Sequence, residues 1–507
     1  MKDNGKSKPA LPQGIAVPKR VQCFIDGKRV AGTGVEIPII YPATEDVIGT
    51  LEEAAANEVD AAVTAAREAF DRGPWPEMGI PERKAVLQSI RSHLLENAEE
   101  LAVLECLDTG VPIRTIRGRK IKRLTDNFEL FAESLSMMAG QTYQQDKKFL
   151  TMVTHEPVGV AALIAPWNSP LGLATAKLAP CIAYGNTCVL KPSEHTPMAL
   201  ARMVEILHEA GLPKGVVNLV NGRGPVTGAA LVEHPGVDLV AFTGGTETGR
   251  SVMSAAAGNL APVALELGGK SANIITETAD FEQALDGALL AIYSNNGQQC
   301  LAGSRILVHR SIADRFIERF VERARQVRLG DPMDPECEMG PLAFREHLEK
   351  VLSYVDIALG EGAELLTGGK RAEGFEAGYY FEPTAVLAPS NGLRVCQEEI
   401  FGPFAAIQVY DSLDEAIDIA NDTEFGLVAY VWSEDLHTIT RVTQALRAGT
   451  VWVNTPLVRE VRAPFGGYKS SGVGRDGVRE FLDFFTEQKT TQIPIGKLSL
   501  ARLGAGS

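Results

Sequence analysis

The chain has 507 residues, of which 45% are hydrophobic and 22% are charged, and its formal net charge is −15. Such a length exceeds that of one ordinary core, so we expect two large domains. The acidic charge disfavours nucleic acids and anionic membranes as partners, because their phosphates would be repelled. No run of about eighteen apolar residues occurs, so no membrane-spanning helix is expected.

The cysteines are sparse, odd in number and without a CxxC pair, so neither a disulfide framework nor a structural zinc site is expected. The eight histidines show no metal-ligand spacing either, and we predict no metal site. A reducing cytoplasm is the simplest compartment for free thiols. The seven cysteines are Cys23, Cys106, Cys181, Cys188, Cys300, Cys337 and Cys396.

Residues 1–20 are basic and lack an apolar core of signal-peptide length, so we expect a disordered N-terminal segment in a soluble protein. The stretch QCFIDGKRV then predicts an extended pair. Residues 57–70 place Val59, Val63 and Phe70 at helical spacing behind Asn57, a residue typical of helix caps. This pattern predicts an amphipathic helix with Asn57 at its start.

From about Val158 the pattern changes to short apolar runs that alternate with helical segments. Such alternation predicts a parallel sheet flanked by helices, an architecture that places ligands at the carboxyl ends of its strands. The predicted strands are VAALIA (160–165), TCVLK (187–191), VVNLV (216–220), LVAF (239–242) and VALEL (263–267).

A second alternating series begins near Lys270 and predicts a second α/β domain. Its strands are ANII (272–275), RILVHR (305–310), FAAIQVY (404–410), LVAYVW (427–432) and TVWVN (450–454). Residues 144–159 and 486–495 fit neither series, because they are polar and β-prone. They predict ribbons outside both cores, and an exposed ribbon edge often pairs with another subunit, so we expect a homo-oligomer.

Two glycine-rich turns between a strand and a helix are candidate phosphate sites. In NGRGPVTGAAL, Gly224 and Gly228 follow a strand, although such turns are also common for steric reasons alone. In AFTGGTETGR, Gly244, Gly245 and Thr246 would offer backbone N–H groups at a helix N-terminus. The second turn is the better placed, and the first leaves a cofactor role and a steric role equally open.

Polar residues beside the predicted strand ends have both functional and structural interpretations. Lys191 and Glu194 follow TCVLK and would bond ribose hydroxyls, or else belong to a solvated proline loop. Glu266 lies at the end of an apolar strand, where desolvation raises a carboxyl pKa toward that of a general base, unless backbone donors satisfy it.

Asn168 and Cys300 are candidates for carbonyl chemistry. Asn168 lies in APWNSPL, where its amide would donate to an oxyanion or simply form a turn next to proline. Cys300 lies in SNNGQQCLAGSR, whose small and polar residues would leave the thiol accessible, whereas most free cysteines are packed. No histidine is near Cys300 in sequence, so no Cys-His protease signature is present.

The segments PWNSP, KPSE, FTGGTETG, LELGGK, GQQC, EEIFGPF and PFGGYKSSGVGR occur in the order and spacing of the aldehyde dehydrogenase superfamily. The chain resembles this family from about Gln22 to Ile495, and Glu266 precedes Cys300 by the 34 positions found in the family. The resemblance implies a Rossmann-like cofactor domain, a second α/β catalytic domain and a small β-ribbon for oligomerisation.

The resemblance also implies the catalytic roles. Cys300 attacks an aldehyde carbonyl to give a thiohemiacetal, whose oxyanion is held by the Asn168 amide and the Cys300 backbone N–H. Hydride transfer to the nicotinamide leaves a thioester, and Glu266 activates the water that hydrolyses it. Lys177 matches a lysine that borders the site and relays protons.

By the same resemblance, Lys191 and Glu194 hold the adenosine ribose, while Glu399 and Phe401 position the nicotinamide ribose. Because Glu194 would repel a 2′-phosphate, NAD is favoured over NADP. The remaining predicted cofactor contacts are Ile164, Pro166, Trp167, Gly224, Gly228, Phe242, Thr243, Gly244, Gly245, Thr246 and Leu267.

The positions that match the family's substrate tunnel indicate a bulky aldehyde, because several that often carry aromatic residues are small here. These tunnel positions are Ser169, Gly172, Ala176, Ser294, Leu301, Arg459 and Phe465. We expect an aromatic or terpenoid-like aldehyde. If Arg459 or Arg462 contacts the substrate, we expect the aldehyde to carry a carboxylate as well. Equally, these arginines belong to a solvated loop with Glu460 between them.

The family's organisation implies boundaries for the parts of this chain. Residues 21–140 and 160–269 are expected to bind NAD, residues 270–483 to form the catalytic domain, and residues 141–159 and 484–507 to build the oligomerisation ribbon and tail of a homodimer or homotetramer. Two alternatives remain: a coenzyme A-acylating semialdehyde dehydrogenase, which generally lacks the carboxylate of Glu266, and a non-catalytic NAD-binding structural protein.

Overall fold

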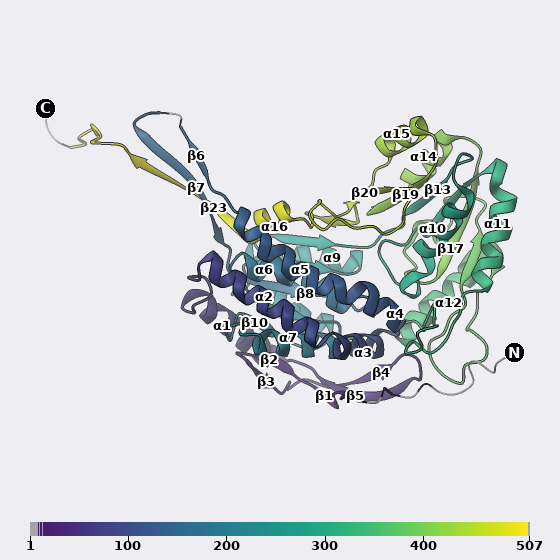
Figure 1. The fold of residues 1–507 in the computed structure, drawn as a ribbon, viewed down its shortest axis with the longest axis horizontal. Helices are drawn as coiled ribbons and strands as arrows, with labels where there is room; N and C mark the ends of the chain where they lie inside the picture. The colour runs from purple at the N-terminus through teal and green to yellow at the C-terminus, as the bar shows by residue number, and fades with distance from the viewer. Residues whose placement is uncertain (1–8, 10, 13, 145, 505–507) are drawn as a thin grey trace.

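The computed structural model describes residues 9, 11–12, 14–144 and 146–504. Two large sheets flanked by helices form two lobes, and a narrow ribbon projects from one of them (Figure 1). Of the segment predicted to be disordered, residues 1–8, 10 and 13 lie outside the described part, and Arg20 already begins strand β1 (Arg20–Val21). In the described part, no helix is long and apolar enough to cross a membrane.

The first large sheet has eight strands in the order β22-β12-β11-β8-β9-β10-β2-β3. Its five central strands run parallel, and all five predicted from the apolar runs are confirmed. Their carboxyl ends therefore meet at one edge, where Ile164, Lys191 and Glu266 end their strands. The bounds are β2 (Cys23–Ile25), β3 (Lys28–Val30), β8 (Val160–Ile164), β9 (Thr187–Lys191), β10 (Val217–Leu219), β11 (Leu239–Thr243), β12 (Val263–Glu266) and β22 (Gly472–Val473).

Helices cover both faces of this sheet, because alternate residues of its strands point to opposite sides. On β8, Ala161 and Leu163 pack against one helical layer, whereas Val160 and Ala162 pack against the other. The first layer contains α2 (Ile80–Glu96), α3 (Ala98–Thr109), α5 (Ile121–Ser134), α6 (Pro170–Ala183) and α7 (Met198–Glu209). The second layer contains α1 (Ala56–Asp71), α8 (Ala229–Glu233) and α9 (Thr246–Ala256).

The helix predicted for residues 57–70 is confirmed as α1, but the prediction of Asn57 as its cap is wrong. The helix begins at Ala56, and Ala55 occupies the cap position. The carboxylate of Glu58 accepts the backbone N–H of Ala55 at 2.8 Å, so a side chain within the first turn satisfies this end of the helix.

The second large sheet has seven strands in the order β15-β16-β17-β14-β13-β19-β20. The five predicted strands are confirmed, and the short β15 and β16 were missed. The predicted boundary at residue 270 falls between β12 and β13, which belong to different sheets, although the division into domains stays a prediction. The bounds are β13 (Ala272–Ile275), β14 (Arg305–His309), β15 (Glu364–Thr367), β16 (Thr384–Leu387), β17 (Phe404–Tyr410), β19 (Val428–Trp432) and β20 (Thr450–Val453).

Helices also pack around this second sheet. Tyr293, at the end of α10, and Phe316 and Phe320, on α11, lie in the apolar cluster that covers one of its faces. The helices of this lobe are α10 (Phe281–Tyr293), α11 (Arg310–Arg325), α12 (Arg345–Gly360), α13 (Arg394–Gln397), α14 (Leu413–Asn421) and α15 (Leu436–Ala445). A further three-stranded sheet near the N-terminus, which the sequence analysis did not predict, contains β1, β4 (Glu36–Tyr41) and β5 (Asp46–Glu52).

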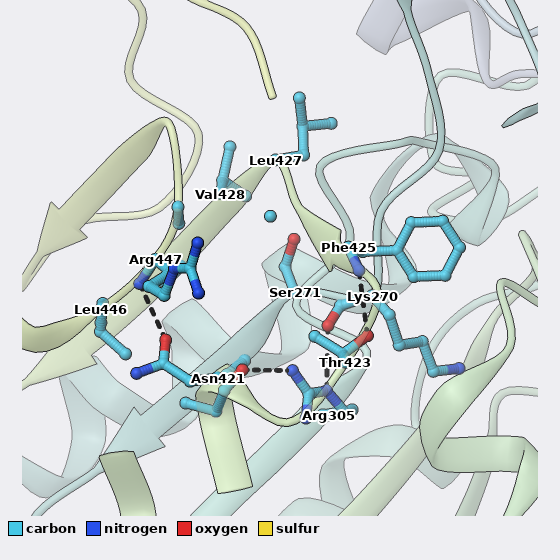
Figure 2. Close-up of a pocket in the computed structure, with 15 residues that line it drawn as sticks. Lys270, Ser271, Arg305, Asn421, Thr423, Phe425, Leu427, Val428, Leu446 and Arg447 are labelled. Carbon is cyan, nitrogen blue, oxygen red and sulfur yellow. Dashed lines mark hydrogen bonds between the residues drawn. The ribbon is translucent and has the colours of Figure 1, made fainter. Parts of the chain in front are cut away.

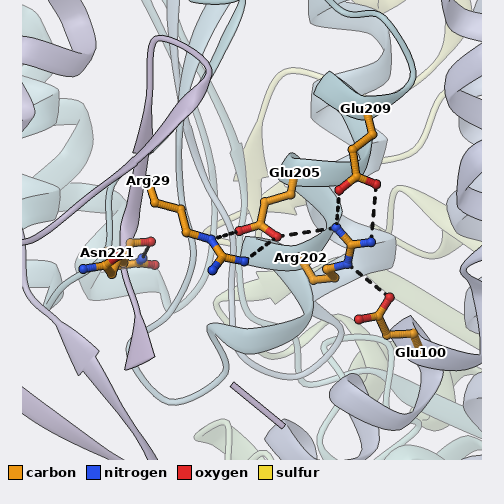
Figure 3. A network of polar contacts seen from close by, with 7 residues as sticks. Arg29, Glu100, Arg202, Glu205, Glu209 and Asn221 are labelled. Atoms are coloured by element: carbon orange, nitrogen blue, oxygen red, sulfur yellow. Dashed lines mark hydrogen bonds and ion pairs between the residues drawn. The ribbon is translucent and has the colours of Figure 1, made fainter. Parts of the chain in front are cut away.

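A network of ion pairs ties β3 to two outer helices (Figure 3). Arg29 on β3 bonds to Glu205 on α7, and Arg202 bonds to Glu205, Glu209 and, on α3, Glu100. Half-exposed pairs of this kind contribute little to stability. Because the carboxylates and guanidinium groups of this network bond to one another, we interpret the network as structural.

The projecting ribbon is a three-stranded antiparallel sheet of β6 (Gln141–Tyr143), β7 (Phe149–Pro157) and β23 (Thr486–Pro494). The two predicted ribbons are confirmed as strands, and β23 pairs with β7 along its whole length. The apolar side chains of Leu150, Ile493 and Ile495 are exposed there. Residue 145 and residues 505–507, which the sequence analysis assigned to the ribbon and tail, lie outside the described part.

Candidate active site

A cavity of about 300 Å³ lies at the carboxyl ends of β8, β11 and β12 and reaches the second lobe. Predicted and unpredicted residues share its wall. From the predicted set the lining contains Pro166, Trp167, Asn168, Thr243, Gly244, Gly245, Glu266, Leu267, Cys300, Glu399 and Phe401. The sequence analysis missed Leu173, Gly268, Phe344, Glu346, His347 and Lys350.

Cys300 is partly exposed, whereas the other six cysteines are buried. It follows α10 and the turn Ser294–Gly297, in which Asn295 and Asn296 adopt left-handed φ values of 54° and 58°. Asparagine tolerates this conformation better than most residues. Burial, helped by the nearby carboxylates of Glu399 and Glu266, raises the pKa of the Cys300 thiol to about 12. The thiol is therefore protonated at neutral pH.

The side-chain amide of Asn168 is buried beside the loop that carries Cys300. Its Nδ2 donates to the carbonyl oxygen of Gln298 at 3.0 Å. Asn295 Nδ2 donates both to the Asn168 carbonyl at 3.1 Å and to the Gln298 carbonyl at 2.8 Å. The amide of Asn168 is thus fixed next to the cysteine, and one of its two N–H groups remains for a ligand.

Glu266 ends β12 and is 9% exposed, and its Oε1 has no hydrogen-bond partner in the described structure. Burial, followed by repulsion from Asp476, raises the pKa of Glu266 to about 8, against an opposing effect of Lys177. Lys177 is itself bonded to Asp476, which is also buried. The backbone at Gly466 lies against Glu266, because a Cβ there would be 2.9 Å from Oε1.

The predicted phosphate turn precedes α9, whose first residue is Thr246 and whose cap is Gly245. One part of the prediction is wrong, because the N–H of Gly244 is not free: it donates to the carbonyl of Glu266 at 3.0 Å and continues the pairing of β11 with β12. The space around Gly245 is open, since a Cβ there would meet no atom within 4 Å. Gly245 and Thr246 fit a phosphate.

The predicted ribose residues lie on both lobes. Lys191 ends β9, packs against Gly228 and lies 4.0 Å from the carboxylate of Glu194. Burial lowers the pKa of Lys191 to about 8, although the charges of Glu194 and Glu53 act against this shift. Of the other predicted contacts, Ile164 ends β8, Phe242 and Thr243 end β11, and Gly224 opens the π-helical turn Gly224–Gly228.

On the second lobe, Glu399 accepts the N–H of Gly269 at 2.9 Å, and Lys350 donates to the Glu399 carbonyl at 3.0 Å. Phe401 has a left-handed φ of 65°, and the carbonyl of Phe401 accepts the Nε2–H of His347 at 2.7 Å. Burial lowers the pKa of His347 to about 4, so the ring is a neutral donor. His347 and Lys350 thus hold the two predicted nicotinamide-side residues in place.

The predicted tunnel residues gather around α6 and the loop 455–465. Ser169 and Gly172 lie at the start of α6, and Ala176 lies one turn further on. Ser294 donates to the carbonyl of Leu290 and accepts from Gln299. Leu301 packs with Cys300 and Phe465 in one apolar cluster.

Arg459 lies over the ring of Phe465, 3.9 Å from its centroid, and interacts electrostatically with Asp476, Glu266 and Cys300, although it does not line the cavity. The exposed Arg462 instead bonds to Glu460 at 2.8 Å, so for this residue the solvated-loop interpretation holds. The sequence analysis missed a second arginine, Arg123 on α5, whose Cδ would lie 3.8 Å from a Cβ at Gly172. Burial and then the charge of Arg459 lower the pKa of Arg123 to about 10.

No salt bridge to either Arg123 or Arg459 occurs among the described residues, and the Nε of each is buried without a hydrogen-bond partner. Both guanidinium groups interact electrostatically with Cys300. Two mutually repelling cations beside a thiol form an environment that favours an anion. Within the described part, no cluster of His, Cys, Asp and Glu is arranged to hold a metal ion.

Residues 30–491 match the profile of the Aldehyde dehydrogenase family. The chain belongs to this family. It is 42% identical over 464 residues to the 5-carboxymethyl-2-hydroxymuconate semialdehyde dehydrogenase of Escherichia coli, covering 90% of this chain and 98% of that protein. It is 40% identical over 480 residues to the 2-hydroxymuconic semialdehyde dehydrogenase of Pseudomonas sp. strain CF600, covering 93% and 99%.

The fold agrees with this assignment. A solved NAD+ complex of an aldehyde dehydrogenase from Bacillus cereus superposes with a TM-score of 0.92 at 42% identity, covering 94% of this chain and 97% of that chain. The predicted aldehyde dehydrogenase fold is confirmed, and the protein is an oxidoreductase that uses NAD or NADP. The interpretation as a non-catalytic structural protein is dropped.

A second, small cavity of this aldehyde dehydrogenase, of about 20 Å³, lies behind the turn at Lys270 (Figure 2). The buried guanidinium of Arg305 lies at its wall and donates to the carbonyls of Lys270, Ile419 and Ala420 at 2.7 to 2.9 Å. Arg305 thereby anchors the turn that brings Gly269 to Glu399. We read this cavity as a packing feature that supports the active site.

Cys300 is expected to be the first cysteine that iodoacetamide alkylates. Because the pKa of Cys300 is raised to about 12, its thiolate fraction and its alkylation rate should rise about tenfold per pH unit between pH 7 and 9. Peptide mapping by mass spectrometry measures this rate, and Cys300→Ala is the control that should stay unlabelled over the same time. Earlier labelling of one of the six buried cysteines would contradict the assignment.

Proposed function

We propose that this enzyme oxidises an aldehyde that also carries a carboxylate, with NAD as the oxidant and the carboxylic acid as the product. The observation that supports the substrate class is the pair Arg123 and Arg459, two cations that interact electrostatically with Cys300, form no salt bridge among the described residues and each keep a buried Nε without a hydrogen-bond partner. Guanidinium groups bind carboxylates through two parallel hydrogen bonds, and partial burial strengthens such pairing.

In the proposed reaction, the Sγ of Cys300 bonds to the aldehyde carbon while the thiol proton passes to the carboxylate of Glu266. The oxygen of the thiohemiacetal accepts hydrogen bonds from the Asn168 amide and the Cys300 N–H. Bound NAD would supply the oxidant that takes the hydride from this carbon, which leaves a thioester on Cys300. Glu266 then gives up the thiol proton to solvent and takes a proton from water, whose oxygen bonds to the thioester carbon. As the C–S bond breaks, that proton passes to the sulfur of Cys300, which restores the thiol and releases the carboxylic acid.

The position of Lys177 and Asp476 supports a role for them around Glu266. Asp476 raises the pKa of Glu266, and Lys177 is bonded to Asp476 and opposes this effect. Together they keep the carboxyl of Glu266 near the pKa at which a residue both accepts and releases a proton. We assign Lys177 the relay role and add Asp476 to the groups that act on Glu266.

The relatives support a carboxylated semialdehyde over a terpenoid one. The Escherichia coli and Pseudomonas proteins are both named as semialdehyde dehydrogenases, and the name of the first includes a carboxymethyl group. Ser169 and Gly172 are small and Gly172 lies next to Arg123, so no bulky side chain at these two positions would keep a substrate from this arginine. The carboxylate would meet the two arginines while the aldehyde end reaches Cys300.

NAD is proposed over NADP because of the charges at the adenosine end of the cofactor site. Glu194, near Lys191, would bond the ribose hydroxyls of NAD and repel a 2′-phosphate. Arg223, on the nearby glycine-rich turn, does not offset this repulsion, because Glu53 binds its guanidinium through both carboxylate oxygens at 2.8 Å.

We further propose that β6, β7 and β23 form an interface in a homodimer or homotetramer, since this projecting sheet carries the exposed side chains of Leu150, Ile493 and Ile495. Large exposed apolar surfaces commonly mark protein interfaces. All seven cysteines are free thiols, a state suited to a reducing compartment, and the cytoplasm stays the proposed location.

Replacing the arginines tests the proposed substrate class. Arg123→Met and Arg459→Met should each raise the KM for a carboxylated semialdehyde such as 4-oxobutanoate about 30-fold, because each loses roughly 2 kcal/mol of charge-assisted hydrogen bonding. The kcat/KM for uncharged butanal should stay within about twofold of wild type. Steady-state NADH formation measures both.

Two controls complete this experiment. Arg462→Met, which changes only an exposed arginine paired with Glu460, should leave both substrates unaffected. Cys300→Ala should abolish NADH formation with every aldehyde. Equal losses for charged and uncharged substrates in the arginine variants would contradict carboxylate recognition.

The pH dependence of turnover should reflect Glu266. Because its pKa is raised to about 8, the carboxyl is protonated below that pH, so the rate should rise between pH 7 and 9 with a midpoint near 8. Asp476→Asn removes a charge that raises this pKa and should move the midpoint to lower pH. The exposed Asp483→Asn is the control, and an unmoved midpoint in Asp476→Asn would contradict the assignment.

Glu194→Ser should shift the cofactor preference toward NADP. Loss of the carboxylate removes the repulsion of a 2′-phosphate and should raise the ratio of kcat/KM for NADP to that for NAD at least about tenfold, or roughly 1.4 kcal/mol. Glu282→Ser, at an exposed position on α10, should leave the ratio unchanged. A wild-type enzyme that prefers NADP would refute the proposal.

A further inference from the structure

A buried ion pair lies directly behind Asn168. Lys120 is 8% exposed, Glu105 on α3 is fully buried, and Lys120 Nζ lies 3.0 Å from Glu105 Oε1. Neither residue lines the cavity that contains Cys300. The pair therefore touches neither substrate nor cofactor in the proposed site, and its effect has to pass through the residues it contacts.

Lys120 and Glu105 contact the two ends of the segment from Asn168 to Leu171, which carries the proposed oxyanion donor. Lys120 Nζ donates to the backbone carbonyl of Asn168 at 3.2 Å. Three residues later, the N–H of Leu171 donates to the other oxygen of Glu105 at 3.3 Å. The ion pair thus holds both ends of the turn that leads into α6, while Asn295 holds the same Asn168 carbonyl from the side of Cys300.

The local backbone explains why a lysine in a basic run faces inward. Lys120 ends the π-helical turn Ile116–Lys120, and α5 follows at once. A π-turn adds a residue to the helical turn and changes which side chains face the core, and such turns are frequent at functional sites. Arg119 and Lys122 on either side are exposed, whereas Lys120 and Arg123, three residues apart, share the inner face.

Stability alone is a weak explanation for this pair. Burying two charges is expensive, and well-packed apolar residues commonly replace a buried pair without loss of stability. What an apolar pair cannot supply is the hydrogen bond to the Asn168 carbonyl. The geometry therefore favours a role in positioning.

We propose that Lys120, paired with Glu105, is a positioning residue whose amine holds the backbone at Asn168 so that its side-chain amide meets the oxyanion formed at Cys300. The proposal rests on the proposed thiohemiacetal chemistry. It does not depend on the carboxylated substrate, because the oxyanion forms from any aldehyde.

The test compares variants with and without the Lys120 amine. In Lys120→Met/Glu105→Gln no unpaired charge stays buried, and kcat should fall about tenfold to a hundredfold, the loss expected when an oxyanion donor is misplaced. The fall should be equal for butanal and 4-oxobutanoate, with the Kd for NAD unchanged. The rapid burst of NADH seen when deacylation limits turnover should disappear, because formation of the thioester becomes the slow step.

Glu105→Gln alone is the matched control, because it breaks the ion pair but keeps the amine that donates to Asn168 and an oxygen that accepts from Leu171. It should keep kcat within about threefold of wild type. Equal kcat in the single and double variants would overturn the proposal and leave the pair with a purely structural role. If the methionine variant does not fold, Lys120→Leu/Glu105→Gln provides the same comparison, because leucine also lacks a donor. Activity retained by Cys300→Ala would instead refute the proposed function.

Discussion

The chain passes from the first sheet to the second at residues 266–270, and close packing at this crossing brings the catalytic groups together. A Cβ at Gly268 would overlap the carboxylate of Glu399, and one at Gly269 would lie 2.7 Å from the carbonyl of Cys300. Only glycine lets the backbone approach both elements so closely. Glu266 lies two residues before Gly268 and lines the same cavity as Cys300, and Arg305 anchors the far end of the crossing.

Around this crossing, several charged groups are buried and act on one another. Burial and repulsion from Asp476 raise the pKa of Glu266 to about 8, against the charges of Lys177 and Arg459. Burial and the charge of Arg459 lower the pKa of Arg123, against the charge of Asp476. Burial also raises the pKa of the Cys300 thiol, so its activation depends on groups brought to it and not on a permanently formed thiolate.

The sequence predicted the strands well, because both large sheets are largely parallel, and the buried strands of a parallel sheet read as continuous apolar runs. It also predicted Asn168, Glu266 and Cys300 as one set, since their motifs have the family's order, and the structure places all three on one cavity. Asn57 was wrongly predicted as a helix cap, because the helix already begins at Ala56 and Glu58 in its first turn accepts the N–H of the capping residue Ala55.

Other features of the site were not predicted from the sequence, because they depend on contacts between distant segments. Arg123 belongs to the basic run RGRKIKR, which is typical of a solvated helix face, and only the structure shows that this arginine lies against Gly172 on α6. Gly244 looked like a phosphate donor, but its N–H is taken by strand pairing that no local pattern reveals. His347 and Lys350 lie on a helix far along the chain from the motifs they support.

In the proposed function, recognition and chemistry belong to different parts of the fold. Glu266 and Cys300, the proposed catalytic pair, lie on the crossing and on the loop that packs against it. Arg123 and Arg459, the proposed carboxylate-binding pair, come from a helix and a surface loop, and loops of this kind accept sequence change readily. Under this proposal the substrate class is free to change at these two positions while the chemistry at the cysteine stays the same. Lys120, on the same helical face as Arg123, would join the two parts, because it links the helix that carries Arg123 to the carbonyl of Asn168.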